Sequence, residues 1–401
     1  MEPTPCGSPG ALPVRERALP EIAFVRVLVL ALVFGAAFHI FHVQIHDRSV
    51  NSDIRSHLRI TGSPDDPALR SGHQGLLIIC EVGARALHVD IRTFANHFMG
   101  AVTVALALSF LWVLRAQLGA SCSEGFLLLG AVVLLIVTPI YLPYHDPNLY
   151  LGKWSPNIWH NPTLLTSKPL VIPVFHLFPF LLASMWSRRA AARVALLAAM
   201  LLAATFIKPS FAFTFVPAAA LFVLVRHLRS PRAYLVAAAL VLPAALALLY
   251  QQAVTFGQDD TNGITFAFLR VWSSWTRSIP TAILQAAAFP LAILIFRFRR
   301  CLRDDHLVLS WLFYLVALAQ WSLLAETGRY QSHGNFGWGY ALALTFLFLY
   351  SAVELIRWMA EIPRAAPWQR VAWHFAAALL GLHFASGIFY VIKYMVSGRY
   401  L

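Results

Sequence analysis

Charged residues are scarce in this sequence. Only 12% of its 401 residues are Asp, Glu, Lys or Arg, while 59% are hydrophobic and the mean hydropathy is +0.66. Because an ordinary soluble domain carries about 25% charged residues, this composition excludes that class. Apolar runs of about 17–25 residues, the length that crosses a bilayer, recur along the whole chain. The sequence therefore predicts an all-α, polytopic transmembrane protein.

Acidic residues are the rarest charged type. The chain has 18 Asp and Glu against 31 Lys and Arg, which gives a formal net charge of +13. Such an excess could indicate a nucleic-acid partner. The basic residues are confined to short connections between apolar runs, however, and that pattern is typical of membrane topology. We therefore expect a lipid bilayer as partner and no nucleic acid.

The sequence also lacks the motifs of several other classes. Its four cysteines have no paired spacing, so they predict neither a disulfide framework nor a zinc site: Cys6, Cys80, Cys122 and Cys301. No Gly-rich Walker loop occurs, which leaves nucleotide-driven transport unsupported. No cofactor is predicted, although a divalent cation stays open as a possibility.

The apolar runs predict eleven membrane spans in a single transmembrane domain, residues 22–401. They lie at about 22–42, 94–114, 126–143, 169–187, 193–207, 211–226, 234–252, 279–297, 306–324, 338–357 and 371–395. Residues 1–21 form a cytoplasmic tail in this interpretation. The first span then acts as an uncleaved signal-anchor.

One apolar run, residues 75–89, is not counted as a span. It is short and contains Glu81 and Arg85, so it reads as an interfacial helix within the first extracytoplasmic loop, residues 43–93. With this choice every connection on the cytoplasmic side contains arginine, as the positive-inside rule requires. The long polar loops then share the opposite side. We expect a bacterial inner (plasma) membrane with the active site facing the periplasm or exterior.

The first outward loop supplies a candidate catalytic carboxylate. Asp53 and His57 are four residues apart, which places them on one face of a helix. Asp53 could act as a general base or hold a divalent cation. Alternatively, Asp53 caps the N-terminus of an interfacial helix, a position that Asp favours.

The second outward loop, residues 144–168, is dense in polar residues. Its candidates for substrate binding are Asp146, Asn157, His160, Asn161 and Lys168. Asp, Asn and His form hydrogen bonds with hydroxyls, and Lys can meet a phosphate. The alternative is that prolines shape turns here and the amides satisfy them.

Further candidates lie in the remaining outward segments. Lys208 occupies an apolar hairpin, FIKPSF, where an unpaired ammonium is expensive; it could bind phosphate or reach the lipid headgroups. In the last loop we consider Glu326, Arg329 and His333, of which Arg329 is a bidentate phosphate ligand by type. Asp259 and Asp260 are better explained as a turn.

The chain resembles the GT-C superfamily of membrane glycosyltransferases. The residues that carry the resemblance are SDIRSH in the first outward loop and the amphipathic run 75–89 after it. The segments SPNIWHNPT and KPSF look like those of uncharacterised membrane proteins from polysaccharide-synthesis clusters. The chain departs from the protein O-mannosyltransferase branch, because Ile54 follows Asp53 where that branch has an Asp-Glu pair.

The resemblance implies an activity and its partners. In that superfamily an acidic residue of the first extracytoplasmic loop is the usual catalytic carboxylate, which is Asp53 here. The expected reaction moves a sugar from a polyprenyl-phosphate donor to a glycan, lipid or protein acceptor. The alternatives are a transporter or flippase, or a polymerase, of lipid-linked saccharide. A transporter predicts ionisable residues in the middle of spans, and the sequence has few.

Overall fold

The computed structural model describes residues 19–58, 74–144, 146–184, 187–256, 263–328 and 331–398. Within these residues, ten helices are long and apolar enough to cross a membrane. They are α1 (Leu19–His46), α4 (Ile91–Leu118), α6 (Pro162–Ala183), α7 (Arg188–Ile207), α8 (Ser210–His227), α9 (Pro231–Phe256), α11 (Ile279–Phe296), α13 (Asp305–Leu323), α14 (Gly337–Glu361) and α15 (Pro367–Ser397). A shorter apolar helix, α5 (Glu124–Ile136), makes the eleventh element. The prediction of an all-α integral membrane protein with about eleven spans is confirmed.

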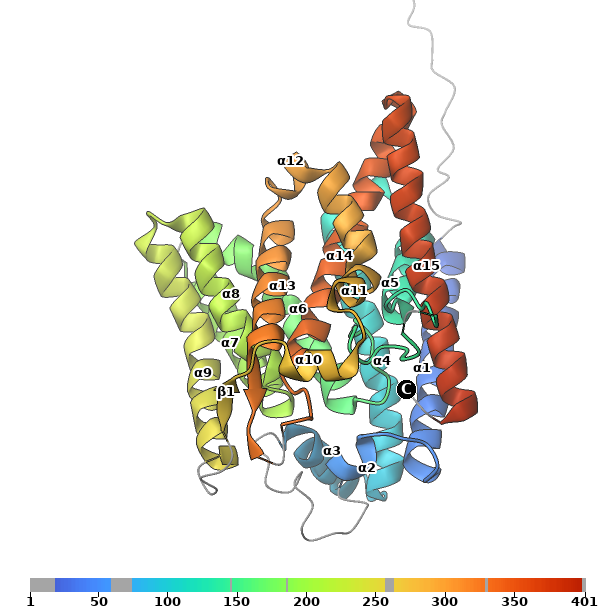
Figure 1. The fold of residues 1–401 in the computed structure, drawn as a ribbon, viewed down its shortest axis with the longest axis vertical. Coiled ribbons are helices and arrows are strands. Elements are labelled where there is room, and N and C mark those ends of the chain that lie inside the picture. The colour runs from blue at the N-terminus through green and yellow to red at the C-terminus, as the bar shows by residue number, and fades with distance from the viewer. Residues whose placement is uncertain are drawn as a thin grey trace, which may run out of the picture.

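Short elements connect the long helices at both ends of the bundle. They are α2 (Ile54–His57), α3 (Gly75–Ala86), η2 (Gly119–Ser121), β1 (Ile264–Phe266), α10 (Arg270–Trp275), α12 (Phe298–Cys301), β2 (Leu324–Glu326) and η4 (Ile362–Arg364). Strands β1 and β2 pair antiparallel, with Ile264 opposite Glu326. Figure 1 shows α2, α3 and β1 at one end of the bundle and α12 at the other. Helix α3 has 12 residues, too few to cross, and packs against α4 and α7.

The arginine-rich connections are tied together by ion pairs. Arg297 contacts Glu354 and Glu361, both at 2.8 Å, and Arg357 contacts Asp304 at 2.8 Å. Further pairs join Arg26 and Arg115 to Glu124, and Arg226 to Asp305. These pairs connect the helices at the end of the bundle where α12 lies. Described parts of the predicted outward segments, α2, α3 and the β1–β2 pair, lie at the opposite end.

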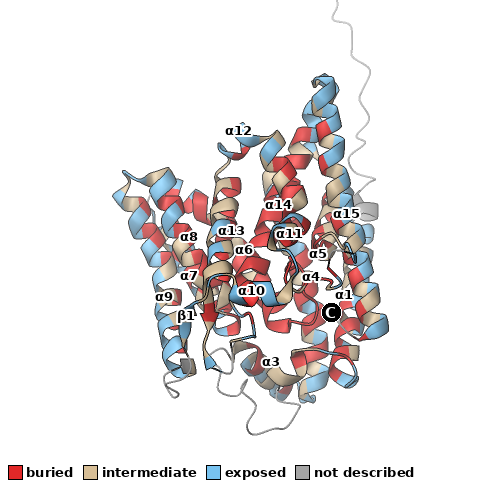
Figure 2. Cartoon of the chain, viewed as in Figure 1, coloured by how far each residue is buried: buried red, intermediate tan, exposed pale blue. Residues whose placement is uncertain are grey.

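Helix α14 is the centre of the bundle. Its most hydrophobic window is 94% buried, against 17% for α1 and 22% for α15. Figure 2 shows this contrast, with α14 mostly buried and the outer helices exposed on one face. Ring stacking joins α14 to its neighbours, for example Phe346 to Phe175 of α6, with ring centroids 4.0 Å apart. The outer helices therefore present apolar surface to lipid while α14 serves as the core.

Two predicted boundaries are wrong. The prediction placed residues 144–168 in a loop, but α6 already begins at Pro162, so Lys168 is helical. Asn161 caps this helix and Pro162 is its first residue, which are both start signals that the polar composition obscured. Helix α5 ends at Ile136 instead of residue 143, because the next residues bond to other helices. Thr138 N donates to His383 O at 3.3 Å and Ile140 N to Gln285 O at 2.9 Å.

Candidate functional site

Asp53 is held by the polar segment 144–161 of the second outward loop, over a hundred residues away in sequence. It occupies the N-cap position of α2, yet its side chain makes no capping hydrogen bond within the described residues. Its Oδ2 instead accepts a hydrogen bond from Asn161 Nδ2 at 2.8 Å. Its main-chain N–H donates to His160 O at 3.2 Å. The capping explanation for Asp53 is therefore wrong, and the carboxylate is oriented by tertiary contacts.

The chain segment around Asp53 is fixed by a single arginine. The Arg55 guanidinium donates to the carbonyl oxygens of Gln44, Asp47 and Val50, at 2.6, 2.7 and 2.7 Å. The buried Gln44 side chain also donates to Trp159 O at 3.0 Å. Because these bonds join the end of α1 to α2 and the polar segment, the backbone that bears Asp53 is preorganised.

Lys208 is a buried cation close to Asp53. It lies in the turn between α7 and α8, is 7% exposed, and its Nζ stands 4.6 Å from the centre of the Trp338 ring. Burial lowers the pKa of Lys208 to about 8, while the negative charges of Asp53 and Glu326 oppose this shift. Lys208 is therefore close enough to act electrostatically on both carboxylates.

The neighbouring titratable groups respond to the same environment. Burial raises the pKa of Asp53, opposed by Lys208 and by the Asn161 hydrogen bond. Burial, with a smaller effect of Lys208, lowers the pKa of His57 and of His160 to about 3. Both histidines are therefore neutral at physiological pH. Burial also raises the pKa of Glu326, opposed by Asn335 and Lys208, so the ionisation of both Asp53 and Glu326 is balanced between burial and this cation.

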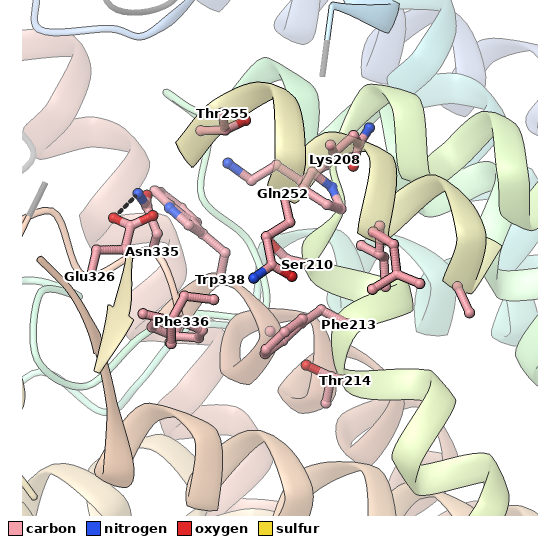
Figure 3. Close-up of a pocket in the computed structure, with 17 residues that line it drawn as sticks. Lys208, Ser210, Phe213, Thr214, Gln252, Thr255, Glu326, Asn335, Phe336 and Trp338 are labelled. Atoms are coloured by element: carbon pink, nitrogen blue, oxygen red, sulfur yellow. Dashed lines mark hydrogen bonds between the residues drawn. The ribbon is translucent and has the colours of Figure 1, made fainter. Parts of the chain in front are cut away.

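A cavity of about 450 Å³ adjoins Lys208. It lies between α8, α9, the β1–β2 pair and the start of α14. Apolar side chains form one part of its wall, among them Phe213, Leu248, Leu249, Phe336 and Trp338, and the polar groups include Lys208, Gln252, Thr255, Glu326 and Asn335. In Figure 3 the Glu326–Asn335 pair, joined by a hydrogen bond of 2.6 Å, lies on one side and Lys208 on the other. Asp53 does not line this cavity, so Lys208 is the link between the two.

A cluster of tryptophans, which the sequence did not predict, packs beside the cavity. Trp154 of the polar segment packs against Trp275, Trp321 and Trp338, with ring centroids 5.7, 5.4 and 4.9 Å apart. A side chain on Gly337 would overlap the Trp154 ring, so this position requires glycine. Since these residues are far apart in sequence, only the count of 12 tryptophans hinted at such a cluster.

Three predicted binding residues of the second loop make hydrogen bonds within the protein that hold the loop in place. Asn157 Nδ2 donates to Leu134 O and Val137 O at 2.8 and 3.0 Å, which caps the end of α5. The buried Lys168 donates to Pro156 O and to Asn157 Oδ1. Asp146 accepts hydrogen bonds from Asn148 N at 3.0 Å and Thr276 Oγ1 at 3.1 Å. None of the three lines the cavity, and their assignment as substrate ligands stays a prediction.

The remaining candidates fall into separate places. The His160 ring lies between the hydroxyls of Tyr150, at 2.9 Å, and Tyr390, at 3.5 Å. His333 is exposed and does not line the cavity. Arg329, Asp259 and Asp260 lie outside the described residues. Within the residues that the structure describes, there is no group of three or more His, Cys, Asp and Glu side chains that could hold a metal ion.

No protein-family model, curated protein or solved structure matches this chain. The resemblance to the GT-C superfamily therefore rests on the short SDIRSH segment and the plan of the loops. The function has to be argued from the geometry around Asp53 and Lys208.

Proposed function

We propose that this protein is a membrane glycosyltransferase of GT-C type that uses a polyprenyl-phosphate-linked sugar. The observation that carries the proposal is the placement of Asp53. Its carboxylate does not cap α2 but is bound by Asn161, in the electrostatic range of Lys208. A carboxylate held in this way at the membrane end of a helix bundle is suited to act as a general base.

The cavity beside Lys208 suits the lipid part of such a donor. Its apolar wall comes from α8, α9 and the start of α14, and α9 lies at the edge of the bundle. A prenyl chain would pack on this wall while its phosphate meets the Lys208 ammonium. Glu326 and Asn335 offer hydrogen-bonding groups for sugar hydroxyls on the other side of the cavity.

The proposed reaction is a direct substitution at the anomeric carbon. Asp53 accepts the proton of an acceptor hydroxyl, and that oxygen forms the new bond to the anomeric carbon. The bond between this carbon and the phosphate oxygen breaks, and the lipid phosphate leaves with the electron pair. Because negative charge grows on the leaving oxygen, the Lys208 cation stabilises the transition state.

The alternatives of a transporter, flippase or polymerase find less support. A transporter uses ionisable side chains inside its spans. The buried histidines of the described spans have contacts within the protein: His306 Nε2 contacts His176 O at 2.9 Å, His383 Nδ1 contacts Thr138 O at 2.6 Å, and His176 Nδ1 contacts the Tyr350 hydroxyl at 3.1 Å. These contacts explain the histidines as structural, without a transport role.

The test is a transfer assay on the purified protein in lipid nanodiscs. A panel of radiolabelled polyprenyl-phosphate hexoses and pentoses is offered with lipid and glycan acceptors. We expect Asp53→Asn to lower the rate by about 10²–10⁴-fold, the usual contribution of a general base, with an unchanged thermal midpoint. Asp146→Asn is the matched control, because it removes a carboxylate from the same end of the bundle but away from the cavity. Full activity of Asp53→Asn would refute the catalytic assignment, and a wild-type protein inactive on the whole panel would refute the glycosyltransferase.

The membrane side of the site is a second part of the proposal. We propose that the arginine-rich end faces the cytoplasm of a bacterial cell and that Asp53 faces the periplasm or exterior. Tyr144 is 97% exposed at the polar end, so Tyr144→Cys is a suitable reporter. A membrane-impermeant maleimide should label it from outside intact cells or spheroplasts. Labelling only after lysis would place the site on the cytoplasmic side.

A further inference from the structure

One amide side chain joins the start of α6 to Asp53. Asn161 is 1% exposed, and its Oδ1 accepts hydrogen bonds from Leu164 N at 2.9 Å and Thr163 Oγ1 at 3.0 Å. The main-chain N–H of Leu164 can only donate, so it requires an oxygen at that position, which determines which end of the amide is which. The Nδ2 group therefore points at Asp53 Oδ2, 2.8 Å away. Asn161 thus has two separate tasks, capping a helix and donating to a carboxylate.

We propose that Asn161 is a positioning residue, which fixes the Asp53 carboxylate to the N-terminus of α6. The sequence suggested a direct substrate contact for this residue. The geometry assigns it instead an action through Asp53, because each of its polar atoms is already used within the protein. The kinetic part of this inference rests on the proposed glycosyltransferase activity, but the link between the two side chains does not.

The bond matters because the carboxylate is in an unfavourable environment. Burial disfavours the charged form of Asp53, and a hydrogen bond donated to the charged form opposes this. Asn161 also stands at the positive end of a 22-residue helix, whose dipole favours a negative charge. Among the described residues, the other charged group that acts on Asp53 is Lys208, which favours the charged carboxylate. His57 and His160 lie next to Asp53 through main-chain hydrogen bonds, and burial keeps both rings neutral.

The two tasks of Asn161 can be separated by substitution. In Asn161→Ser the hydroxyl oxygen keeps a good N-cap, whereas the donor to Asp53 is lost. In Asn161→Ala both the cap and the donor are lost. Ser187→Ala is the matched control for a lost cap alone, because Ser187 Oγ accepts from Ala190 N at the start of α7, away from Asp53. If Asn161→Ser does not fold, Asn161→Thr also keeps an N-cap oxygen, lacks the amide donor and adds no charge beside Asp53.

The decisive measurement is the titration of Asp53 itself, by infrared difference spectroscopy of protein carrying ¹³C-labelled aspartate. Asp53→Asn identifies the signal, and the full chain in nanodiscs is used throughout. We expect the Asp53 pKa to rise by roughly 1 unit, a tenfold change in the ionisation equilibrium, in both Asn161 variants but not in Ser187→Ala. The thermal midpoint should fall more in Asn161→Ala than in Asn161→Ser.

The kinetic readout gives an independent check. The acidic limb of the pH–rate profile should move upward together with the infrared titration. If Asn161→Ser leaves the Asp53 titration unmoved, Asn161 only caps α6 and the inference is wrong. If the titration moves although the wild-type protein transfers no sugar, the positioning role stands and the proposed function fails.

Discussion

Gly337→Ala tests how tightly the tryptophan cluster below the cavity is packed. Gly337 begins α14, the most buried helix, and directly precedes Trp338 under Lys208. A Cβ atom added there would lie 2.5 Å from Trp154 Nε1 and closer still to two carbons of the same ring. Such distances essentially never occur between real Cβ atoms and other heavy atoms, so something must move. Trp154 is 1% exposed and enclosed by three other tryptophans, which leaves little space for it.

The magnitude follows from two opposing effects. Replacing glycine by alanine in a helix gains up to ~1 kcal/mol in propensity. Overfilling a packed core costs about 1–3 kcal/mol, and this overlap belongs at the upper end. We expect a net loss of roughly 2 kcal/mol in the free energy of unfolding. An unfolding entropy of about 2.1 cal/mol/K per residue gives ~0.8 kcal/mol/K for the 401-residue chain, so the midpoint should fall by about 2–3 °C.

The assay is thermal unfolding in detergent at a fixed scan rate, with comparison of apparent midpoints. Gly381→Ala in α15 is the matched control, because a Cβ there meets nothing within 4 Å. Trp154→Phe should partly rescue Gly337→Ala by vacating the overlapped space. Trp154 Nε1 is without a hydrogen-bond partner in the described structure, so that change sacrifices no bond. Strictly additive effects of the two substitutions, or a Gly337→Ala midpoint equal to that of Gly381→Ala, would show that the packing argument is wrong.

Three further predictions concern charged groups. Lys168→Met should lower the thermal midpoint by removing the donor to buried acceptors, worth about 1–3 kcal/mol, while the KM for the donor stays unchanged. Glu354→Gln should destabilise the protein by about 1–3 kcal/mol, because Arg297 loses a buried charged partner but keeps Glu361; chemical denaturation measures this loss. The rate should fall at low pH as Asp53 is protonated, above the ordinary carboxyl value, and at high pH as Lys208 loses its proton near pH 8. Lys208→Arg keeps the positive charge, so it should abolish the fall in rate at high pH. A rate that changes at neither low nor high pH would show that Asp53 and Lys208 do not control the reaction.

The fold could be predicted because the membrane imposes simple constraints. Apolar runs and alternating arginine-rich connections define the spans, and Glu81 and Arg85 correctly exclude α3 from them. The two wrong boundaries arise where polar residues enter the bundle. Lys168 made the start of α6 look like a loop, although its partners are supplied by the chain itself. Span prediction rests on polarity, and polarity does not reveal whether an internal partner exists.

The candidate site could be predicted only in part. Asp53, Lys208 and Glu326 were found because each is a charge in a segment where charge is rare, and the structure brings them to one end of the bundle. Gln252 and Trp338 line the cavity but were not predicted, since nothing in the local sequence marks them. Their positions depend on the packing of α9 against α8 and of α14 behind both. Such long-range packing is absent from any local pattern.

The polar segment after α5 shows why a cluster of polar residues in a membrane protein can indicate either a functional site or a structural requirement. A segment without regular structure carries main-chain carbonyl and N–H groups that lipid cannot satisfy. Lys153, Asn157 and Lys168 meet carbonyl oxygens of this segment or of the end of α5. The residues that look most catalytic by type are therefore needed to bury the segment. Asn161 differs from them because its Nδ2 donates to the side chain of Asp53. This bond is not required for folding the polar segment. Function should be sought where a buried polar side chain donates to an ionisable side chain of another element, as Asn161 does to Asp53, and not to main-chain carbonyl groups, as Asn157 does.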